Sequence, residues 1–270
     1  AGKEIALANK ETLVAAGRLV MEKAAAQGVR ILPVDSEHSA IFQALQGCPD
    51  MKEIKRIILT ASGGPFFGKT VAELETVTVE QALNHPNWSM GAKITIDSAT
   101  MMNKGLELIE AVWLFAVQPD SVDILVHRQS IVHSLVEFND NSVIAQLGVP
   151  DMRIPIQYAL TYPNRYQSPV EQLRLEEWGN LTFESPDDEA FPCMNLCRKA
   201  IRLDGLYPAA VNAANEVANK LFRDGKIKFL QIAEMVEKAM DAAAVKEEYS
   251  LQDVLDTDSF ARRFVTENLS

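Results

Sequence analysis

The chain has 270 residues, 47% hydrophobic and 23% charged, which is the composition of a folded globular protein with one large domain or two modest ones. The chain has a net charge of -11, and its sequence shows no basic face of Lys and Arg. Both observations argue against non-specific binding to nucleic acids or to anionic membranes. The three cysteines lack a C-x-x-C spacing, which makes a disulfide framework or a zinc site a poor interpretation and fits a reducing cytoplasm.

Short apolar strands alternate with helical patterns through the first half of the chain. Strands are predicted at residues 4–8, 30–34, 56–60 and 93–97, and helices at about 11–27, 38–46 and 103–115. Strands separated by helices are typical of a largely parallel sheet.

The pattern changes in the second half. Three strand-like runs fill residues 122–148, and the Asn139-Asp140-Asn141 turn between the last two predicts antiparallel pairing there. Residues 162–187, rich in Pro, Ser and acids, are predicted to be a linker, and only helical periods follow up to residue 270, one of them ending at Gly225. The fold prediction is α+β: a mixed sheet with covering helices, then a small all-α domain.

A cluster of polar residues follows the second predicted strand. Asp35 or Ser36 can cap the helix expected near His38, with Glu37 in its first turn. Alternatively, Asp35 and Glu37 lie two residues apart in extended chain, point to the same side and share one cation. The stretch by itself leaves both interpretations open.

Two later segments contain candidate anion-binding groups. Ser62, Gly63 and Gly64 follow a predicted strand, where backbone N–H groups can approach a phosphate or simply form a tight turn. Ser98, Asn103 and Lys104 are expected in the loop and first helical turn after the strand predicted at 93–97, where their donors can converge on one phosphate or serve as caps and solvated side chains.

Glu107 stands three residues after Lys104 on the same helical face. If it meets Asp35 and Glu37, the three carboxylates form an all-oxygen site that suits magnesium or manganese better than zinc. The segment 84–91 contains Trp88 and a possible Gly91 hinge, so it is either a lid over a ligand or a loop anchored to the core. His127 and His133 on predicted strands are each more simply interpreted as satisfied sheet histidines.

Seven motifs occur together in the order and spacing of one family: ALANKE, PVDSEH, SGGPF, HPNWSMG, DSATMMNKGLE, LGVPDMR and NAANE. On these residues the chain resembles the 1-deoxy-D-xylulose 5-phosphate reductoisomerase family essentially from end to end. The resemblance implies a remnant of an NADPH-binding domain at 1–34, a catalytic domain at 35–161, the linker at 162–187 and a helical domain at 188–270.

The resemblance also implies that most of an N-terminal Rossmann-like domain is absent. The 13 glycines include no pair separated by one residue, so the chain has no G-x-G-x-x-G to seat a pyrophosphate. The start, which lacks Met, reads as that of a fragment, and a fragment without this domain is expected to be inactive by itself.

The family's site residues carry over by position. The resemblance implies a divalent metal, Mg²⁺ or Mn²⁺, on Asp35, Glu37 and Glu107. It implies that the substrate phosphate is bound by Ser62, Ser98, Asn103 and Lys104, with His85 closing over it. Lys10, Ser36 and Glu37 approach the sugar backbone, Asn9, Glu11 and Gly91 touch the nicotinamide end of NADPH, and His133 lies near the active site.

The implied activity is the metal-dependent, NADPH-linked rearrangement and reduction of 1-deoxy-D-xylulose 5-phosphate by a cytoplasmic homodimer, with Lys10, Glu37 and His133 as catalytic residues. One departure from the family pattern is Arg128, where proline is expected at a strand edge that pairs subunits. On the residues alone, two other functions remain open: a non-catalytic sugar-phosphate or metal-binding module, and a metal-dependent aldolase or isomerase without nicotinamide.

Overall fold

The computed structural model describes residues 2–244 and 246–269, which divide into two compact units. The first unit draws on Ala1–Lys10, Met21–Ser62 and Ala111–Ser185, and the second on Glu11–Val20, Gly63–Glu110 and Pro186–Ser270. Two helices, α1 (Glu11–Ala26) and α6 (Met102–Phe115), supply residues to both units. Among the described residues, no helix is long and apolar enough to cross a membrane.

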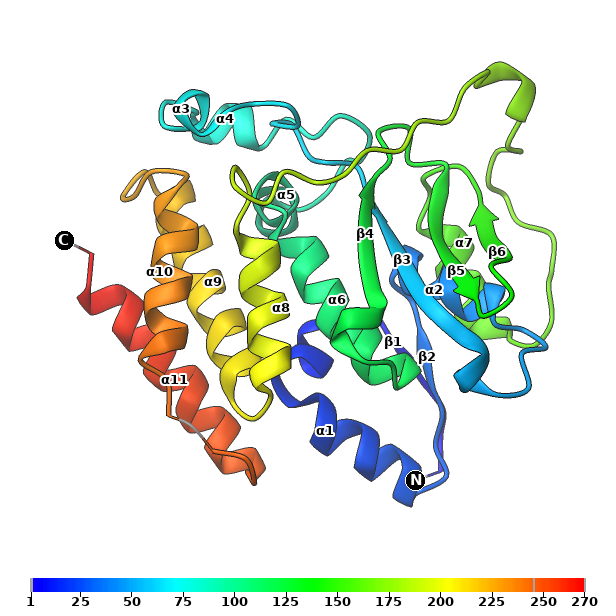
Figure 1. Ribbon diagram of the computed structural model, residues 1–270, viewed down its shortest axis with the longest axis horizontal. Coiled ribbons are helices and arrows are strands. Elements are labelled where there is room, and N and C mark those ends of the chain that lie inside the picture. The colour runs from blue at the N-terminus through cyan, green and yellow to red at the C-terminus, as the bar shows by residue number, and fades with distance from the viewer. Residues whose placement is uncertain (1, 245, 270) are drawn as a thin grey trace. The chain divides into compact units, whose positions relative to one another are not determined.

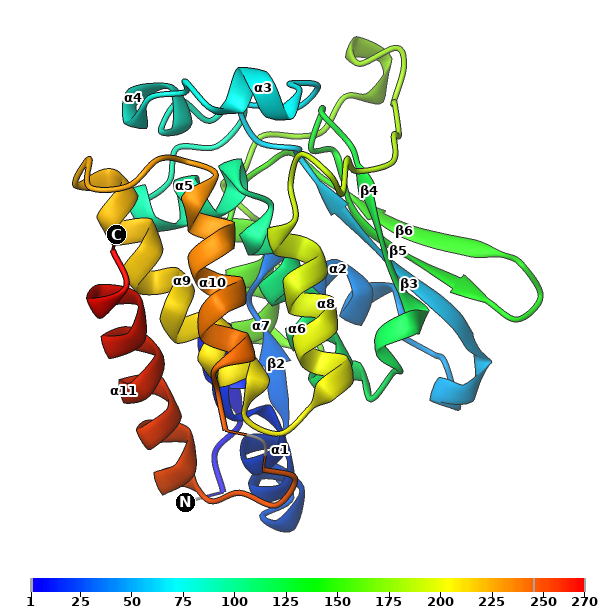
Figure 2. The same ribbon diagram turned by 60° about the vertical axis from the view of Figure 1, so that its left-hand side comes forward.

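The first unit contains two sheets. In the smaller one, β1 (Ile5–Leu7) and β2 (Ile31–Pro33) pair in parallel. The larger has the order β4-β3-β5-β6 and consists of β3 (Ile54–Ala61), β4 (Val122–Val126), β5 (Val132–Phe138) and β6 (Val143–Leu147). Figure 1 and Figure 2 show β3 in its interior, parallel to β4 and antiparallel to β5. The larger sheet is therefore mixed.

The hairpin predicted between β5 and β6 is confirmed. Asn141 adopts a positive φ of 66°, and the Asp140 side chain accepts hydrogen bonds from the Ser142 backbone and hydroxyl, so the turn is closed by its own residues. The antiparallel expectation is wrong for β4, which pairs in parallel with β3. Residues 62–121 separate these two strands, and a connection of that length lets the chain return in the same direction.

The helices α2 (Ser36–Ala44) and α7 (Arg153–Thr161) belong to the first unit. Helix α2 packs against β5, β6 and α7. A small core there joins Leu32, Val34 and Ala159, with Phe42 and Tyr162 packed against it. Three short 3₁₀ turns, at Met51–Glu53, Pro119–Ser121 and Leu175–Glu177, complete the unit; the last lies in the predicted linker. The predicted domain boundaries themselves stay a prediction.

The second unit is helical in the residues that the structure describes. Besides parts of α1 and α6, it contains α3 (Val71–Leu74), α4 (Val79–Ala82), α5 (Ala92–Ala99), α8 (Cys193–Leu203), α9 (Tyr207–Arg223), α10 (Gln231–Asp241) and α11 (Leu251–Glu267). In Figure 1, α8, α10 and α11 lie beside α9, and all three pack against it. The α+β fold with a helical C-terminal part is confirmed.

Helix α9 fits in the middle of this bundle because many of its own buried side chains are small. Alanines at positions 209, 210, 213, 214 and 218 are all buried. The helix ends where predicted, with Gly225 in the left-handed region at φ 69°.

The close packing of α6 on α8 requires a glycine. A Cβ built on Gly105 would lie 2.7 Å from the Cys197 sulfur, so any side chain there would force the helices apart. Cys193 and Cys197 are both buried on α8, and burial raises the pKa of the Cys193 thiol to about 12 and that of Cys197 well above its ordinary value. These thiols therefore act as small hydrophobic groups.

The strand predicted at 93–97 is wrong, because these residues form most of helix α5. The run Ile94, Thr95 and Ile96 favours a strand by propensity. In the structure this run is helical instead. The Thr95 hydroxyl donates to the Gly91 carbonyl, and Lys93 forms an ion pair with Asp97 one turn later. Tertiary contacts described below decide the outcome over local preference.

Candidate functional site

The polar cluster after β2 forms the start of helix α2. Asp35 is the N-cap, and its carboxylate accepts from the Glu37 backbone N–H at 3.1 Å. The Ser36 hydroxyl donates to the Glu37 carboxylate at 2.5 Å. The capping interpretation is thus confirmed, while the extended geometry assumed for Asp35 and Glu37 is wrong, since Glu37 already lies in the helix. The two carboxylates nevertheless stand at the same helix end, shortly after β2 ends at Pro33.

Two cationic or ionisable side chains of the first unit approach Asp35. The Lys10 ammonium forms an ion pair with the Asp35 carboxylate at 2.5 Å, and only 7% of Lys10 is exposed. The Nδ1 atom of the buried His38 lies 3.4 Å from the other oxygen of Asp35. The structure therefore brings Lys10, predicted only from the resemblance, together with the predicted acids.

His133 lies on β5 and lines a small crevice that also includes Ser36, Gln43 and Asp151. Its Nε2 atom is 3.1 Å from the Gly148 carbonyl, which fixes the ring in the sheet. His127 directly follows β4 instead of ending it, and its ring bridges the Thr182 carbonyl and the Ile131 N–H. Of these two histidines, His133 therefore shares a crevice with a predicted substrate residue.

The Ser62-Gly63-Gly64 segment directly follows β3, and the turn begins at the next residue, Pro65. Both glycines adopt positive φ, at 77° and 66°. The Ser62 carbonyl accepts from the Arg128 guanidinium at 2.9 Å, and partial burial lowers the pKa of Arg128 below its ordinary value. The unexpected arginine thus holds the backbone at Ser62, and both residues belong to the first unit.

In the second unit, the predicted phosphate donors lie at the ends of two helices. Ser98 lies in the last turn of α5, and Asn103 and Lys104 lie in the first turn of α6. The loop position predicted for Ser98 after a strand is therefore wrong. The Asn103 amide donates to the Glu107 carboxylate at 2.5 Å, and the Lys104 ammonium pairs with its other oxygen.

Burial sets the character of the α6 cluster. Lys104 is 4% exposed and Glu107 is 1% exposed, so an ammonium and a carboxylate face each other out of solvent. The prediction that these residues share one helix face is confirmed. Such a pair can exchange its mutual contact for a phosphate on the lysine and a metal ion on the glutamate.

The residues predicted at the nicotinamide rim lie near the starts of helices. Asn9 is exposed, Glu11 opens α1, and Gly91 is the N-cap of α5. The Glu11 carboxylate pairs with the Lys93 ammonium at 2.7 Å. In the segment 84–91, the His85 ring accepts from the backbone N–H groups of Asn87 and Trp88, which folds this stretch on itself. Its role as a lid stays a prediction.

Sequence reasoning missed a buried network around Asp97, which is 1% exposed. Asn215 and Asn219, both fully buried on α9, donate to the same oxygen of Asp97 at 2.9 and 2.8 Å. The Lys93 ammonium contacts the other oxygen at 2.9 Å. The available signal was the pair of asparagines four residues apart on one helix face, which polar residues rarely occupy in a core without a partner.

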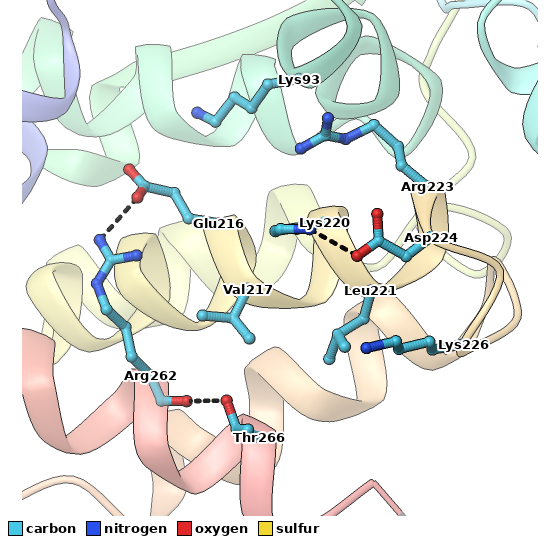
Figure 3. A pocket seen from close by; sticks show the side chains of 10 residues that line it. All are labelled: Lys93, Glu216, Val217, Lys220, Leu221, Arg223, Asp224, Lys226, Arg262 and Thr266. Atoms are coloured by element: carbon cyan, nitrogen blue, oxygen red, sulfur yellow. Dashed lines mark hydrogen bonds and ion pairs between the residues drawn. The ribbon is translucent and has the colours of Figure 1, made fainter.

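A groove of about 590 Å³ opens in the second unit, lined by residues of α5, α9 and α11 (Figure 3). Its cations are Lys93, Lys220, Arg223, Lys226 and Arg262. Lys220 pairs with Asp224, Arg262 with Glu216 and Asp258, and Lys93 with Glu11 and Asp97. The groove is therefore close to electrically balanced, and its basic residues do not define a separate anion site.

Taken unit by unit, this geometry defines a class: an α+β protein with carboxylates suited to hard cations and buried donors suited to a phosphate. Comparisons with known proteins narrow the class. Residues 31–115 match a family described as the 1-deoxy-D-xylulose 5-phosphate reductoisomerase C-terminal domain, and residues 147–264 match the DXP reductoisomerase C-terminal domain.

Curated relatives agree over almost the whole chain. The 1-deoxy-D-xylulose 5-phosphate reductoisomerase of Acetivibrio thermocellus is 59% identical over 98% of this chain and 69% of its own length. That of Bacillus pumilus is 57% identical over 97% of this chain and 69% of its own length. The chain therefore belongs to the 1-deoxy-D-xylulose 5-phosphate reductoisomerase family, and the resemblance found in the sequence is confirmed.

Solved structures show the same likeness. The Zymomonas mobilis enzyme in complex with NADPH is 48% identical, with a TM-score of 0.93 over 100% of this chain and 69% of that chain. A DOX-P reductoisomerase in complex with NADPH, fosmidomycin and magnesium is 44% identical, with a TM-score of 0.94 over 99% of this chain and 70% of that chain.

Proposed function

We propose that this chain carries the substrate-binding and metal-binding part of an enzyme that converts 1-deoxy-D-xylulose 5-phosphate to 2-C-methyl-D-erythritol 4-phosphate, a step of non-mevalonate isoprenoid biosynthesis in the cytoplasm. The observation that carries the proposal is the 59% identity over 98% of the chain with a curated enzyme of that name. The local geometry of each unit supports the roles assigned below.

The proposed metal ligands are Asp35, Glu37 and Glu107, and the ion is Mg²⁺ or Mn²⁺. Three carboxylates provide the hard oxygen donors that these ions prefer. Related structures carry magnesium, which supports this donor set. When bound, the ion supplies Lewis-acid polarisation of a substrate carbonyl.

Ser62, Ser98, Asn103 and Lys104 are proposed to bind the substrate phosphate, with His85 above it. The buried Lys104 ammonium is worth more to a phosphate there than on the surface, because little water competes for it. Holding the phosphate fixes the reacting end of the sugar relative to the catalytic groups. The phosphonate of fosmidomycin, bound by two related structures, has the same anionic chemistry.

Lys10, Glu37 and His133 are proposed as catalytic residues, with Ser36 binding the sugar backbone. The ion pair with Asp35 holds the Lys10 ammonium in place, where it can stabilise an oxyanion. The Glu37 carboxylate, hydrogen-bonded to the Ser36 hydroxyl, can take up and return a proton during the rearrangement.

Asn9, Glu11 and Gly91 are proposed to contact the nicotinamide end of NADPH, which supplies the hydride that reduces the rearranged aldehyde. Such a rim lacks the pyrophosphate and ribose contacts that hold a dinucleotide, and no G-x-G-x-x-G occurs in the 270 residues. The 270-residue chain by itself is therefore proposed to bind ligands weakly and to turn over no substrate.

The chain is also proposed to form a homodimer through strand β6. This strand lies at the edge of the four-stranded sheet, and its Val143, Ile144 and Leu147 are 37–48% exposed. An apolar edge strand is a ready surface for pairing with a second copy.

The metal proposal is tested by calorimetric titration of Mn²⁺ into the chain and its Glu107→Gln variant. The variant keeps the hydrogen-bonding shape but loses the charge, so Mn²⁺ affinity should fall roughly tenfold or more. Glu237→Gln, an exposed change on α10, is the matched control and should bind Mn²⁺ as the unaltered chain does. Equal affinity in both variants would remove Glu107 from the site.

The activity proposal is tested by NADPH oxidation with 1-deoxy-D-xylulose 5-phosphate and Mn²⁺. No turnover above background is expected from the 270 residues alone. A rate of about 1 s⁻¹ or more, ordinary for an enzyme, would show that these residues suffice to hold the cofactor.

A further inference from the structure

The Asp97 network joins a helix that carries two proposed ligand residues to the centre of the second unit. Helix α5 has Gly91 at its N-cap and Ser98 in its last turn. Asp97 directly precedes Ser98, and its buried carboxylate accepts two amide donors from α9. The other end of the helix is held as well, because the Asn219 amide also donates to the Lys93 carbonyl at 2.9 Å.

Both ends of the Asn219 side chain are used. Its amide nitrogen bonds α5 at Asp97 and Lys93, and its oxygen accepts from the Arg223 guanidinium at 2.8 Å. Figure 3 shows Arg223 and Lys93 where they reach the groove. The orientation of the Asn219 amide is therefore fixed by three partners, which makes it a rigid attachment for α5.

Lys93 extends the network toward the start of α1. Its ammonium lies 2.9 Å from Asp97 and 2.7 Å from Glu11. Burial lowers the pKa of Lys93, but the two carboxylates outweigh burial, so the pKa stands above its ordinary value and the ammonium stays charged. Glu11 is one of the residues proposed at the nicotinamide rim.

We propose that Asp97 is a positioning residue: held by Asn215, Asn219 and Lys93, it fixes α5 so that Ser98 meets the substrate phosphate while Gly91 and Glu11 keep their place at the nicotinamide. The inference rests on the proposed function, because it takes Ser98 and Gly91 as ligand residues. It adds Asp97, Asn215, Asn219 and Lys93, which are not among the proposed ligand residues and act through the helix.

A physical need for such a network exists. The β-branched run in α5 gives it low helix propensity, and a helix of 8 residues gains little stability from its own hydrogen bonds. A phosphate-binding serine displaced by about 1 Å loses most of its value for catalysis. The buried hydrogen bonds of Asn215 and Asn219 to Asp97 supply the rigidity that the local sequence does not.

The test compares Asn219→Ala and Asn215→Ala with Asn212→Ala as matched control. Asn212 is also a buried amide of α9, but it donates to Glu216 on the same helix and not to α5. Hydrogen exchange of the α5 amides should quicken in the first two variants relative to the control. Binding of fosmidomycin with Mg²⁺, followed by amide chemical shifts because this readout detects weak binding, should weaken roughly tenfold in the same two variants.

A charge swap separates positioning from general loss of stability. Asp97→Asn alone places two amides in contact at positions 97 and 219, and Asn219→Asp alone places two carboxylates there. Both single variants should therefore weaken fosmidomycin binding. The double variant restores one amide–carboxylate pair, with the new carboxylate beside Arg223, but it loses the donor to the Lys93 carbonyl and the ion pair of Lys93. It should therefore bind fosmidomycin more tightly than either single variant, without reaching the affinity of the unaltered chain. Melting temperatures of all variants are measured beside the affinities.

The outcomes are distinct. Unchanged α5 exchange in Asn219→Ala, or unchanged affinity at accelerated exchange, overturns the positioning role, as does a double variant that exceeds both single variants in melting temperature but not in affinity. If the unaltered chain shows no shifts with fosmidomycin, the proposed function fails and the ligand part of the inference fails with it. The exchange data then still decide whether the network holds α5.

Discussion

The start of α2 and the whole of α5 are both short helical segments that carry candidate ligand residues, yet they form for different reasons. At α2, the cap is local: Asp35 bonds the backbone of Glu37, two residues away. At α5, the decisive partners of Asp97 come from α9, 118 and 122 residues further along the chain. The first kind of helix is visible in a sequence window, and the second is not.

The contrast has an energetic side. A side-chain cap contributes about 1 kcal/mol to stability. A buried carboxylate bound by two amides and an ammonium contributes more, because removing one donor leaves a buried charge short of a hydrogen bond, at a cost of about 1–3 kcal/mol. Changes at α5 should therefore cost more than changes at the α2 cap.

The largest expected effect is at Gly64, which lies against the end of α5. A Cβ built there would lie 2.7 Å from the Ser98 carbonyl oxygen, and the residue has a φ of 66°. Gly64→Ala should lower the free energy of unfolding by about 3 kcal/mol, part from the left-handed backbone and part from the clash. Urea unfolding measures it.

Gly225→Ala is the control for backbone strain alone. Gly225 has a similar φ of 69°, but a Cβ there would meet nothing within 4 Å. Its cost should be about 1 kcal/mol. If Gly64→Ala and Gly225→Ala lose the same stability, the contact of Gly64 with α5 adds no cost to the substitution. The difference in stability drawn between α2 and α5 would then be too large.

A smaller effect is expected at the α2 cap. Both Asp35→Asn and Asp35→Ala leave the buried Lys10 ammonium without its carboxylate, so the cap is measured by the difference between them. Asp35→Asn keeps a capping oxygen, so Asp35→Ala should be less stable than Asp35→Asn by about 1 kcal/mol. Both variants remove the carboxylate and should weaken Mn²⁺ binding alike. Unfolding and calorimetry on the same samples separate the two roles, and an Asn variant as unstable as the Ala variant would contradict the capping role.

The sequence predicted the parts of this molecule that neighbouring residues decide. Helix α1, the hairpin with Asn141 and the cap at Asp35 all follow from short-range rules, and the structure has them. The strand expected at 93–97 failed because β-branched propensity is outweighed by Asn215 and Asn219, which no local window contains. The direction of β4 failed because hydrophobic alternation gives no strand orientation.

The candidate site follows the same division. The cluster of Asn103, Lys104 and Glu107 was predictable because residues three and four apart meet on one helix face. Lys10 reached the prediction only by resemblance, since nothing in the pattern before α1 indicates its ion pair with Asp35. The Asp97 network was missed altogether, because its members are distant in sequence and each is unremarkable alone.

The smallest effect concerns helix α3, which is capped locally like α2. Thr70 and Glu73 form a capping box, and hydrogen bonds from the Thr70 backbone and hydroxyl lower the pKa of the Glu73 carboxyl below its ordinary value. The stability that the ionised carboxylate contributes is present above its unfolded pKa and is lost as pH falls through the lower folded pKa.

The Glu73 titration can be followed by the carbon shift of its carboxyl group. The pKa of Glu73 should lie below its ordinary value in the unaltered chain and return toward that value in Thr70→Ala. Thr78→Ala removes the neighbouring capping box of α4 and should leave the Glu73 midpoint where it was. An unmoved midpoint in Thr70→Ala would deny the local cap.

The buried thiols of α8 give the protein its own chemical reporter. Cys48 is partly accessible in the first unit, whereas Cys193 and Cys197 are buried in the second and resist ionisation. A reagent that reacts with cysteine thiolates should therefore modify Cys48 quickly in the folded chain, and Cys193 and Cys197 only when α8 opens. The stoichiometry of modification over time then measures how often the second unit opens, with no label and no mutation.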